Sequence, residues 1–205
     1  MRVVCYDQSV SFQVPQIVKK HRQLNHSIHP LLYSRWSPRA MSGETISQDQ
    51  LMSLFEAARW APSSNNLQPW KFFYAHRETD YWPIYFDFLN EFNQLWAKNA
   101  SALVVVTAQI ENEKEKSSTA EFDTGAAWQN LALEATYQGL IAHGIGGFSK
   151  IKATKELNLP IDYKTIAMIA IGKTGDLSQI PERMQKNEIP NQRKSLEEVA
   201  KEGFF

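Results

Sequence analysis

The amino-acid sequence predicts an α+β fold in a single compact domain. Segments with helical spacing outnumber segments with strand composition, and the two kinds do not alternate as they do in a doubly wound parallel sheet. The two longest apolar runs, residues 102–106 and 166–171, have the length of buried strands and fall well short of the roughly 18 residues that a membrane span needs. A chain of 205 residues suits one domain better than two.

The first helices are predicted by their boundary residues. Residues 16–24 predict a short helix, which His29 and the proline after it should end. Ser47 and Gln50 have the spacing of a capping box, and apolar residues follow them at helical intervals. We therefore expect a helix over residues 48–60.

The middle of the chain predicts two strands and a helix. The aromatic run at residues 70–74 is typical of a strand, and residues 102–109 should form a buried strand. Pro83 suits the first turn of a helix that continues to about Trp96. Residues 111–116 are mostly charged, which predicts a solvated, mobile loop.

The longest helix is expected over residues 120–143, with Gly144 closing it. Apolar residues occupy nearly all of its sides, which indicates a helix that is buried on all sides. In a chain of this size, a second copy could supply part of that cover. A short helix at residues 150–158, a strand at 164–172 and a polar tail should complete the chain.

The charge balance excludes two classes of partner. The chain has 22 Lys and Arg residues and 22 Asp and Glu residues, so its formal net charge is zero. Proteins that bind nucleic acid or an anionic membrane normally present a strongly basic face, so we expect neither partner here. Cys5 is the one cysteine, which excludes an internal disulfide and favours a cytoplasmic location.

The usual signatures of catalysis by protein side chains are missing. None of the five histidines pairs with another His or Cys at the spacing of a zinc site, so we expect no metal. The sequence lacks a Gly-x-Ser-x-Gly elbow, and Cys5 lies close to the N-terminus, so we expect no covalent nucleophile. The segment Gly144-Ile-Gly-Gly147 does not have the order of a dinucleotide-binding fingerprint.

Three polar, irregular segments remain that could hold an anion or a flat heterocycle. Arg35, Ser37 and Arg39 alternate along one segment, so in an extended backbone their side chains can converge on a phosphate-bearing ligand. By itself, such a segment is more typical of a solvated basic turn.

The other two segments combine exposed backbone with hydrogen-bonding groups. In residues 62–70, Asn66 and Gln68 offer donors and acceptors that suit the uracil-like edge of a flavin, although an ordinary helix-to-strand loop has the same composition. Residues 144–148 are rich in glycine, which would let a flat ring approach the backbone closely. A helix C-cap followed by a turn would use the same residues.

Taken in order, these segments resemble the FMN-dependent nitroreductase family. That family has an Arg-x-Ser-x-Arg segment before its first capped helix and a Pro-Ser-Ser-x-Asn-x-Gln-Pro-Trp loop after it. The matching segments here are Arg35-Trp-Ser-Pro-Arg39 and Pro62-Ser-Ser-Asn-Asn-Leu-Gln-Pro-Trp70. The family's central helix is matched by Asp123-Thr-Gly125 and Gln129-Asn-Leu131, and its C-terminal pattern by Arg193-Lys-Ser-Leu-Glu-Glu-Val199.

The chain also departs from the family pattern. The segment before Arg35 is longer than usual by about twenty residues. Met41 stands where an aromatic residue is common, Asn65 where Phe or Thr is common, and Ser195 where proline is common. These departures bear on the choice of substrate and leave the cofactor residues in place.

The resemblance implies a set of FMN-binding residues. Arg35, Ser37, Arg193 and Lys194 would hold the phosphate. Arg39 would lie near N1 and O2 of the ring, where a fixed positive charge favours the reduced flavin. Two loops would contact the ring itself, through Pro62, Ser63, Ser64, Asn66, Gln68, Gly146 and Gly147. The first loop would address the polar edge, and the glycine amides would approach N5 and O4.

The resemblance further implies a mostly antiparallel central sheet flanked by helices, in an obligate homodimer with its flavin sites between the subunits. Residues 1–28 would form an N-terminal extension to a single FMN-binding domain at residues 29–205. In the implied ping-pong cycle, NADH or NADPH passes hydride to flavin N5, and a nitroaromatic, a quinone or a similar small-molecule acceptor then takes it. Because the flavin carries the hydride, no catalytic side chain is required.

Two other functions fit the same motifs. Relatives with this fold can act in dehalogenation, flavin fragmentation or ring dehydrogenation. A non-catalytic FMN-binding or sensor protein would carry the same cofactor residues and would not oxidise a nicotinamide nucleotide. The motifs name neither the electron acceptor nor the preferred nucleotide.

Overall fold

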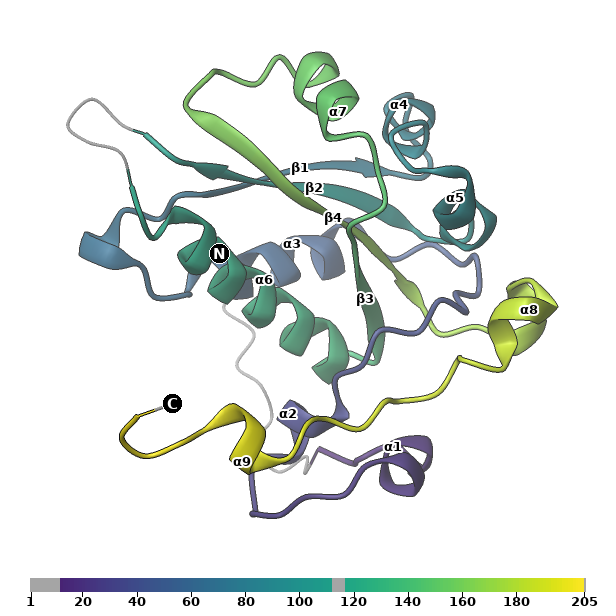
Figure 1. Cartoon of the computed structure of the whole chain (residues 1–205). Helices are drawn as coiled ribbons and strands as arrows, with labels where there is room; N and C mark the ends of the chain where they lie inside the picture. The colour runs from purple at the N-terminus through teal and green to yellow at the C-terminus, as the bar shows by residue number, and fades with distance from the viewer. Residues whose placement is uncertain (1–11, 112–116, 205) are drawn as a thin grey trace.

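The computed structural model describes residues 12–111 and 117–204. Within these ranges, four strands form one antiparallel sheet in the order β1-β2-β4-β3 (Figure 1). The strands are β1 (Trp70–His76), β2 (Ala102–Gln109), β3 (Leu140–Ile145) and β4 (Tyr163–Lys173). The predicted α+β class and its antiparallel sheet are confirmed.

Helices cover both faces of the sheet (Figure 1). One face carries α3 (Gln48–Arg59) and α6 (Ala120–Tyr137), and the other carries α4 (Trp82–Phe86), α5 (Glu91–Ala97) and α7 (Lys150–Glu156). The alternation of side chains along β2 explains the two layers. Val104 and Val106 pack with α3 and α6, whereas Leu103 and Val105 pack in the cluster on the opposite face.

The two ends of the described chain run side by side along one edge of the molecule (Figure 1). The N-terminal segment carries α1 (Gln16–His21) and α2 (Pro30–Ser34), and the C-terminal segment carries α8 (Glu182–Gln185) and α9 (Leu196–Val199). Arg22 Nε donates a hydrogen bond of 3.0 Å to the carbonyl oxygen of Asn191, which joins the two segments. The candidate site lies beside this junction.

The prediction of one helix over residues 120–143 is wrong at its C-terminal end. α6 ends at Tyr137, and Gly139 then adopts a left-handed backbone with a φ of +71°. Glycine adopts this conformation without steric cost, so it lets the chain reverse direction. The apolar run after it forms β3, which pairs with β4 along its whole length. Pairing with a neighbouring strand thus outweighs the helical pattern of this segment.

The predicted helix from Pro83 to about Trp96 is divided in two. α4 ends at Phe86, and Leu89 then forms an isolated bridge with Phe148. Asn90 starts α5 by accepting a hydrogen bond from the backbone N–H of Asn93 with its side chain. An asparagine N-cap in the middle of a helical pattern marks such a restart.

The other elements match their predictions with small differences in length. The capping box of Ser47 and Gln50 starts α3 as predicted, and β1, β2, β4 and α7 lie where strands and a helix were expected. The short helix α2 was not predicted, and the side chain of His29 caps it. The loop predicted at residues 111–116 lies, apart from Glu111, outside the described residues. The domain boundary between residues 28 and 29 stays a prediction.

Helix α6 is not buried on all sides by its own chain. Ala127, Leu131 and Ala135 pack in the core, but Phe122 is 81% exposed. Whether a second copy covers this exposed side stays a prediction. Among the helices of the described ranges, none combines the length and the apolar character needed to cross a bilayer.

Candidate functional site

A cavity of about 470 Å³ lies between the N-terminal and C-terminal segments of the described chain. Its walls come from the end of α1, the extended segment after α2, strand β3 and the segment after α8. The lining residues are Arg22, Arg35, Trp36, Ser37, Arg39, His143, Asn187, Glu188, Ile189, Asn191 and Arg193. The structure thus brings together four of the predicted site residues, from positions more than 150 residues apart in the sequence.

The extended backbone after α2 aims the first motif into this cavity. Arg35 is the C-cap of α2 with an extended conformation (φ −63°, ψ 120°), and the chain continues without helix or strand to Ala40. Arg35, Ser37 and Arg39 all line the cavity. Arg35 Nη1 lies 3.1 Å from Ser37 Oγ and donates a hydrogen bond to it. This arrangement places a guanidinium and a hydroxyl where one anion can contact both.

Like charges surround the cavity. Burial, together with the neighbouring charges of Arg193 and Arg35, lowers the pKa of Arg22 to about 10. Burial and the charge of Arg193 also lower the pKa of Arg35. Three guanidiniums that repel one another raise the energy of the folded chain unless an anion lies between them. The site therefore has the electrostatics of an anion-binding site.

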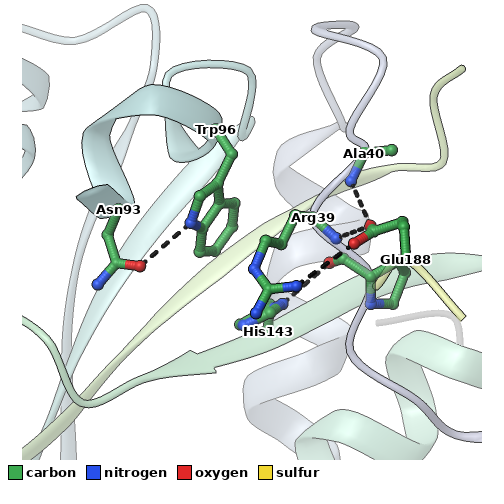
Figure 2. Close-up of polar contacts among 7 residues, drawn as sticks. Arg39, Ala40, Asn93, Trp96, His143 and Glu188 are labelled. Carbon is green, nitrogen blue, oxygen red and sulfur yellow. Dashed lines mark hydrogen bonds and ion pairs between the residues drawn. The ribbon is translucent and has the colours of Figure 1, made fainter. Parts of the chain in front are cut away.

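Arg39, in contrast, has an acidic partner on the C-terminal segment (Figure 2). Glu188 Oε1 accepts hydrogen bonds from the backbone N–H groups of Arg39 and Ala40, the second at 2.8 Å. Glu188 Oε2 lies 3.4 Å from Arg39 Nη1. Glu188 was missed by sequence analysis, because a single acid in a polar tail carries no signal of its burial or of its partners.

His143 is the second cavity residue that sequence analysis missed. It lies on β3, and its Nδ1–H donates to the carbonyl oxygen of Pro38 at 3.0 Å. Its ring centroid is 4.5 Å from that of Trp96, whose Nε1–H donates to Asn93 (Figure 2). Burial is the main cause that lowers the pKa of His143. The helical pattern of residues 120–143 puts residue 143 at a helix end, so nothing in the sequence distinguishes it from the other histidines.

The predicted loop at residues 62–68 does not line this cavity. It lies beside the start of α6, where the backbone N–H of Ser64 donates to Asp123 at 3.1 Å (Figure 1). Asn65, Asn66 and Gln68 have positive φ angles of 49°, 56° and 49°. Residues other than glycine seldom adopt this conformation, and those that do are concentrated at binding sites. The same loop carries Pro62, Ser63 and Gln68. Within one chain, the loop residues predicted to contact the flavin ring therefore lie apart from the arginine cluster.

The last predicted residues lie on two further surfaces. Gly146 and Gly147 follow β3, and a Cβ on Gly147 would approach the side-chain nitrogens of Asn90 and Asn93 to 2.6 Å. A larger residue at position 147 would therefore displace these two side chains. Lys194 does not line the main cavity but an adjoining one of about 460 Å³, which shares Arg22 and Arg193 with it. No group of three or more potential metal ligands occurs in the described part of the chain.

Comparison with known proteins identifies the family. The chain matches the nitroreductase family over residues 32–81 and 76–173, which together make up more than half of its length. The chain belongs to the nitroreductase family. This confirms the resemblance that the ordered motifs predicted.

Similar proteins of known structure or sequence agree with this nitroreductase assignment. A solved structure described as an oxidoreductase containing FMN is 42% identical, with a TM-score of 0.88, over 90% of this chain and 96% of its own. A candidate NADH oxidase from Clostridium acetobutylicum is 27% identical, with a TM-score of 0.63, over 83% of this chain and 97% of its own. A candidate NADH dehydrogenase/NAD(P)H nitroreductase of Archaeoglobus fulgidus is 29% identical over 71% of this chain and 84% of its own length.

Proposed function

We propose that this nitroreductase-family chain is an FMN-dependent oxidoreductase. It would take electrons from NADH or NADPH and pass them to a small organic acceptor such as a nitroaromatic or a quinone. The observation that carries the proposal is the convergence of Arg35, Ser37 and Arg193 on one cavity from opposite ends of the chain. The 42% identical structure whose description includes FMN supports the same cofactor.

The arginine cluster fits the phosphate of FMN. A phosphate monoester carries close to two negative charges near neutral pH and accepts several hydrogen bonds at once. Arg35 and Arg193 offer planar guanidiniums, and Ser37 offers a hydroxyl next to Arg35. A dianion between these groups would offset the repulsion that the guanidiniums exert on one another.

Arg39 would supply positive charge to the flavin ring. Glu188 accepts hydrogen bonds from the N–H groups on either side of the Arg39 Cα, which fixes the point where the Arg39 side chain begins. The ion pair at 3.4 Å holds one edge of the guanidinium, and the side chain keeps 30% of its surface exposed at the cavity. A held positive charge of this kind stabilises negative charge that develops on a bound ring.

A second copy of the chain would complete the site. The loop at residues 62–68 and the arginine cluster occupy different places on one subunit, yet the proposed cofactor needs both. The loop is tied to the start of α6 through Ser64 and Asp123, and the neighbouring Phe122 is exposed. Pairing two α6 helices across a symmetric interface would cover Phe122 and bring the loop of one subunit toward the cavity of the other.

In the proposed function, the cofactor and the chain have different tasks. Bound FMN would supply the two-electron hydride chemistry. The residues of the chain bind the phosphate, orient the ring and keep backbone amides accessible to it. Gly146 contributes to the last task, because a Cβ built there meets no atom within 4 Å and the peptide is open on that side.

A flavin titration followed by reduction tests the proposal. Purified protein stripped of flavin should take up FMN and lose its visible flavin absorbance when NADH or NADPH is added without oxygen. Failure to bind FMN would contradict the proposal. Binding without reduction by either nucleotide would indicate a non-catalytic flavin protein, and reduction without reoxidation by nitroaromatics or quinones would indicate a different flavin chemistry.

A further inference from the structure

The N-terminal segment that precedes the family motifs is anchored in the fold. Val18 of α1 is fully buried. Arg22 caps the end of α1 in an extended conformation (φ −126°, ψ 134°), and it turns into the main cavity as one of the lining residues. This segment therefore contributes directly to the wall of the proposed flavin site.

The guanidinium of Arg22 joins three segments of the chain. Nη1 donates to the carbonyl oxygens of Tyr33 and of Arg35, the second at 2.9 Å. Nε donates to the carbonyl oxygen of Asn191 at 3.0 Å. Arg22 thereby holds the backbone of the Arg-x-Ser-x-Arg segment against the segment that carries Arg193. Among the described residues, none accepts a hydrogen bond from its Nη2.

The charge of Arg22 has no acidic partner at this site. Glu188 is the one acidic residue among those that line the cavity, and it is bonded to Arg39 and Ala40. Arg22 lies instead among guanidiniums, and its own pKa is lowered by burial and by Arg193 and Arg35. Neutral donors could serve the backbone carbonyls equally well without this repulsion. A positive charge at this position therefore calls for an anion.

Building on the function proposed above, we propose that Arg22 is a phosphate-binding residue of the flavin site, contributed by the N-terminal segment. It would act together with Arg35 and Arg193, so that three guanidiniums from three separate segments enclose the phosphate of FMN. The longer N-terminus of this chain then has a defined role. It supplies one charge and fixes the geometry of the other two.

Comparison of two flavins separates this role from a structural one. Riboflavin has the same ring as FMN but no phosphate. Apo-protein is titrated with each flavin, and fluorescence gives both values of Kd. Arg22→Gln keeps an amide donor for the carbonyls but removes the charge. It should weaken FMN binding about tenfold or more, since a hydrogen bond to a charged group is lost, and leave riboflavin binding unchanged.

Lys20→Gln is the matched control. It removes one positive charge from the last turn of the same helix at an exposed position that does not line the cavity. Both flavins should bind this variant as they bind the wild type. A similar loss of FMN affinity in Lys20→Gln would show that the effect of Arg22→Gln is only a change in overall charge, and would overturn the proposal.

The other outcomes are also decisive. Equal weakening of both flavins by Arg22→Gln would show that Arg22 only supports the fold, and unchanged FMN binding would show that it does not contact the phosphate. If thermal melting shows that Arg22→Gln does not fold, Arg22→Met replaces it. Methionine keeps a long unbranched side chain but has no charge, so the preference for FMN over riboflavin should fall, and an unchanged preference overturns the proposal. A wild type that does not prefer FMN contradicts the phosphate site as a whole.

Discussion

At the scale of single residues, Glu188 determines how the cavity is built. Its side chain is 2% exposed, and its carboxylate binds two successive backbone N–H groups as well as the guanidinium of Arg39. One acid thus fixes both the course and the charge of the Arg-x-Ser-x-Arg segment. A buried acceptor with three donors is costly to alter, because each donor that loses its partner remains out of contact with water.

Glu188→Gln should lower the free energy of unfolding by about 1–3 kcal/mol. The charged acceptor is replaced by a neutral amide, whose NH₂ group cannot accept from the N–H donors of Arg39 and Ala40. Urea denaturation measures the change. Glu44→Gln is the control, since the ion pair of Glu44 with Lys173 is largely exposed. That variant should change stability by less than about 1 kcal/mol. Equal losses in the two variants would contradict the role given to Glu188.

Arg35→Ala should weaken FMN binding by about 1.5–3 kcal/mol, through the loss of a charge-assisted contact with the phosphate. Flavin fluorescence titration of the apo-protein measures the change. Lys150→Ala removes an exposed positive charge from α7, away from the cavity, and should leave the affinity as it is. Unchanged FMN affinity in Arg35→Ala would show that the first motif is a solvated turn.

His143 should make stability depend on pH below the ordinary histidine value of 6.5. Burial lowers its pKa in the folded chain, with Arg39 opposing and Glu188 favouring the charged form, so the unfolded chain binds the proton first as the pH falls. The wild type should therefore lose more stability than His143→Gln between about pH 7 and pH 5. Urea denaturation at both pH values tests this, and parallel losses in the two proteins would contradict it.

At the scale of elements, the junction of α6 and β3 decides the edge of the sheet and the position of His143. Gly139 provides the left-handed turn that ends the helix. Without that turn, the run from Leu140 to Ile145 would continue the helix, and β4 would keep β2 but lose its neighbour on the other side. The cavity wall on this side depends on the strand, because His143 faces the cavity from it.

Gly139→Ala should lower the free energy of unfolding by about 1–2 kcal/mol, since alanine is strained at this positive φ. Gly125→Ala, an exposed position inside α6 where a Cβ meets no atom within 4 Å, should instead raise it by up to about 1 kcal/mol. Thermal or urea unfolding at one protein concentration compares them. The same sign in both variants would contradict the assignment of the turn.

At the scale of the whole molecule, the proposed cofactor residues form two groups that lie apart within one chain, and we expect a second chain to bring them together. The arginine cluster lies between the chain ends, and the loop at residues 62–68 lies at the start of α6. Ala135 is fully buried within one chain, so a charge there would disrupt the core and could not report on an interface. Phe122 is exposed, so a charge at this position leaves the core intact and tests the proposed interface.

Phe122→Glu should convert the proposed dimer to a monomer, because a charge would be buried in the proposed α6 interface. Analytical ultracentrifugation measures the mass, and FMN affinity should fall with it. Ile161→Glu is the control, since Ile161 is 99% exposed in the loop before β4 and should leave the dimer intact. A stable Phe122→Glu dimer with normal FMN affinity would place the interface elsewhere.

Local signals in the sequence were sufficient for most of the fold. The capping box at Ser47, the apolar run of β2 and the alternation of Arg35, Ser37 and Arg39 are each read from neighbouring residues. The family also followed from ordered local motifs. These features depend on residues within a turn or a strand of one another, so a single sequence contains them in full.

Only the tertiary structure decided what depends on distant contacts. The run at residues 140–145 became a strand because β4 offers it a partner. Glu188, His143 and Arg22 joined the cavity because separate segments meet there, and nothing near them in the sequence records that meeting. The sequence by itself determined the local conformations and the family, whereas burial, charge pairing and the shape of the site arise from packing between segments that are far apart along the chain.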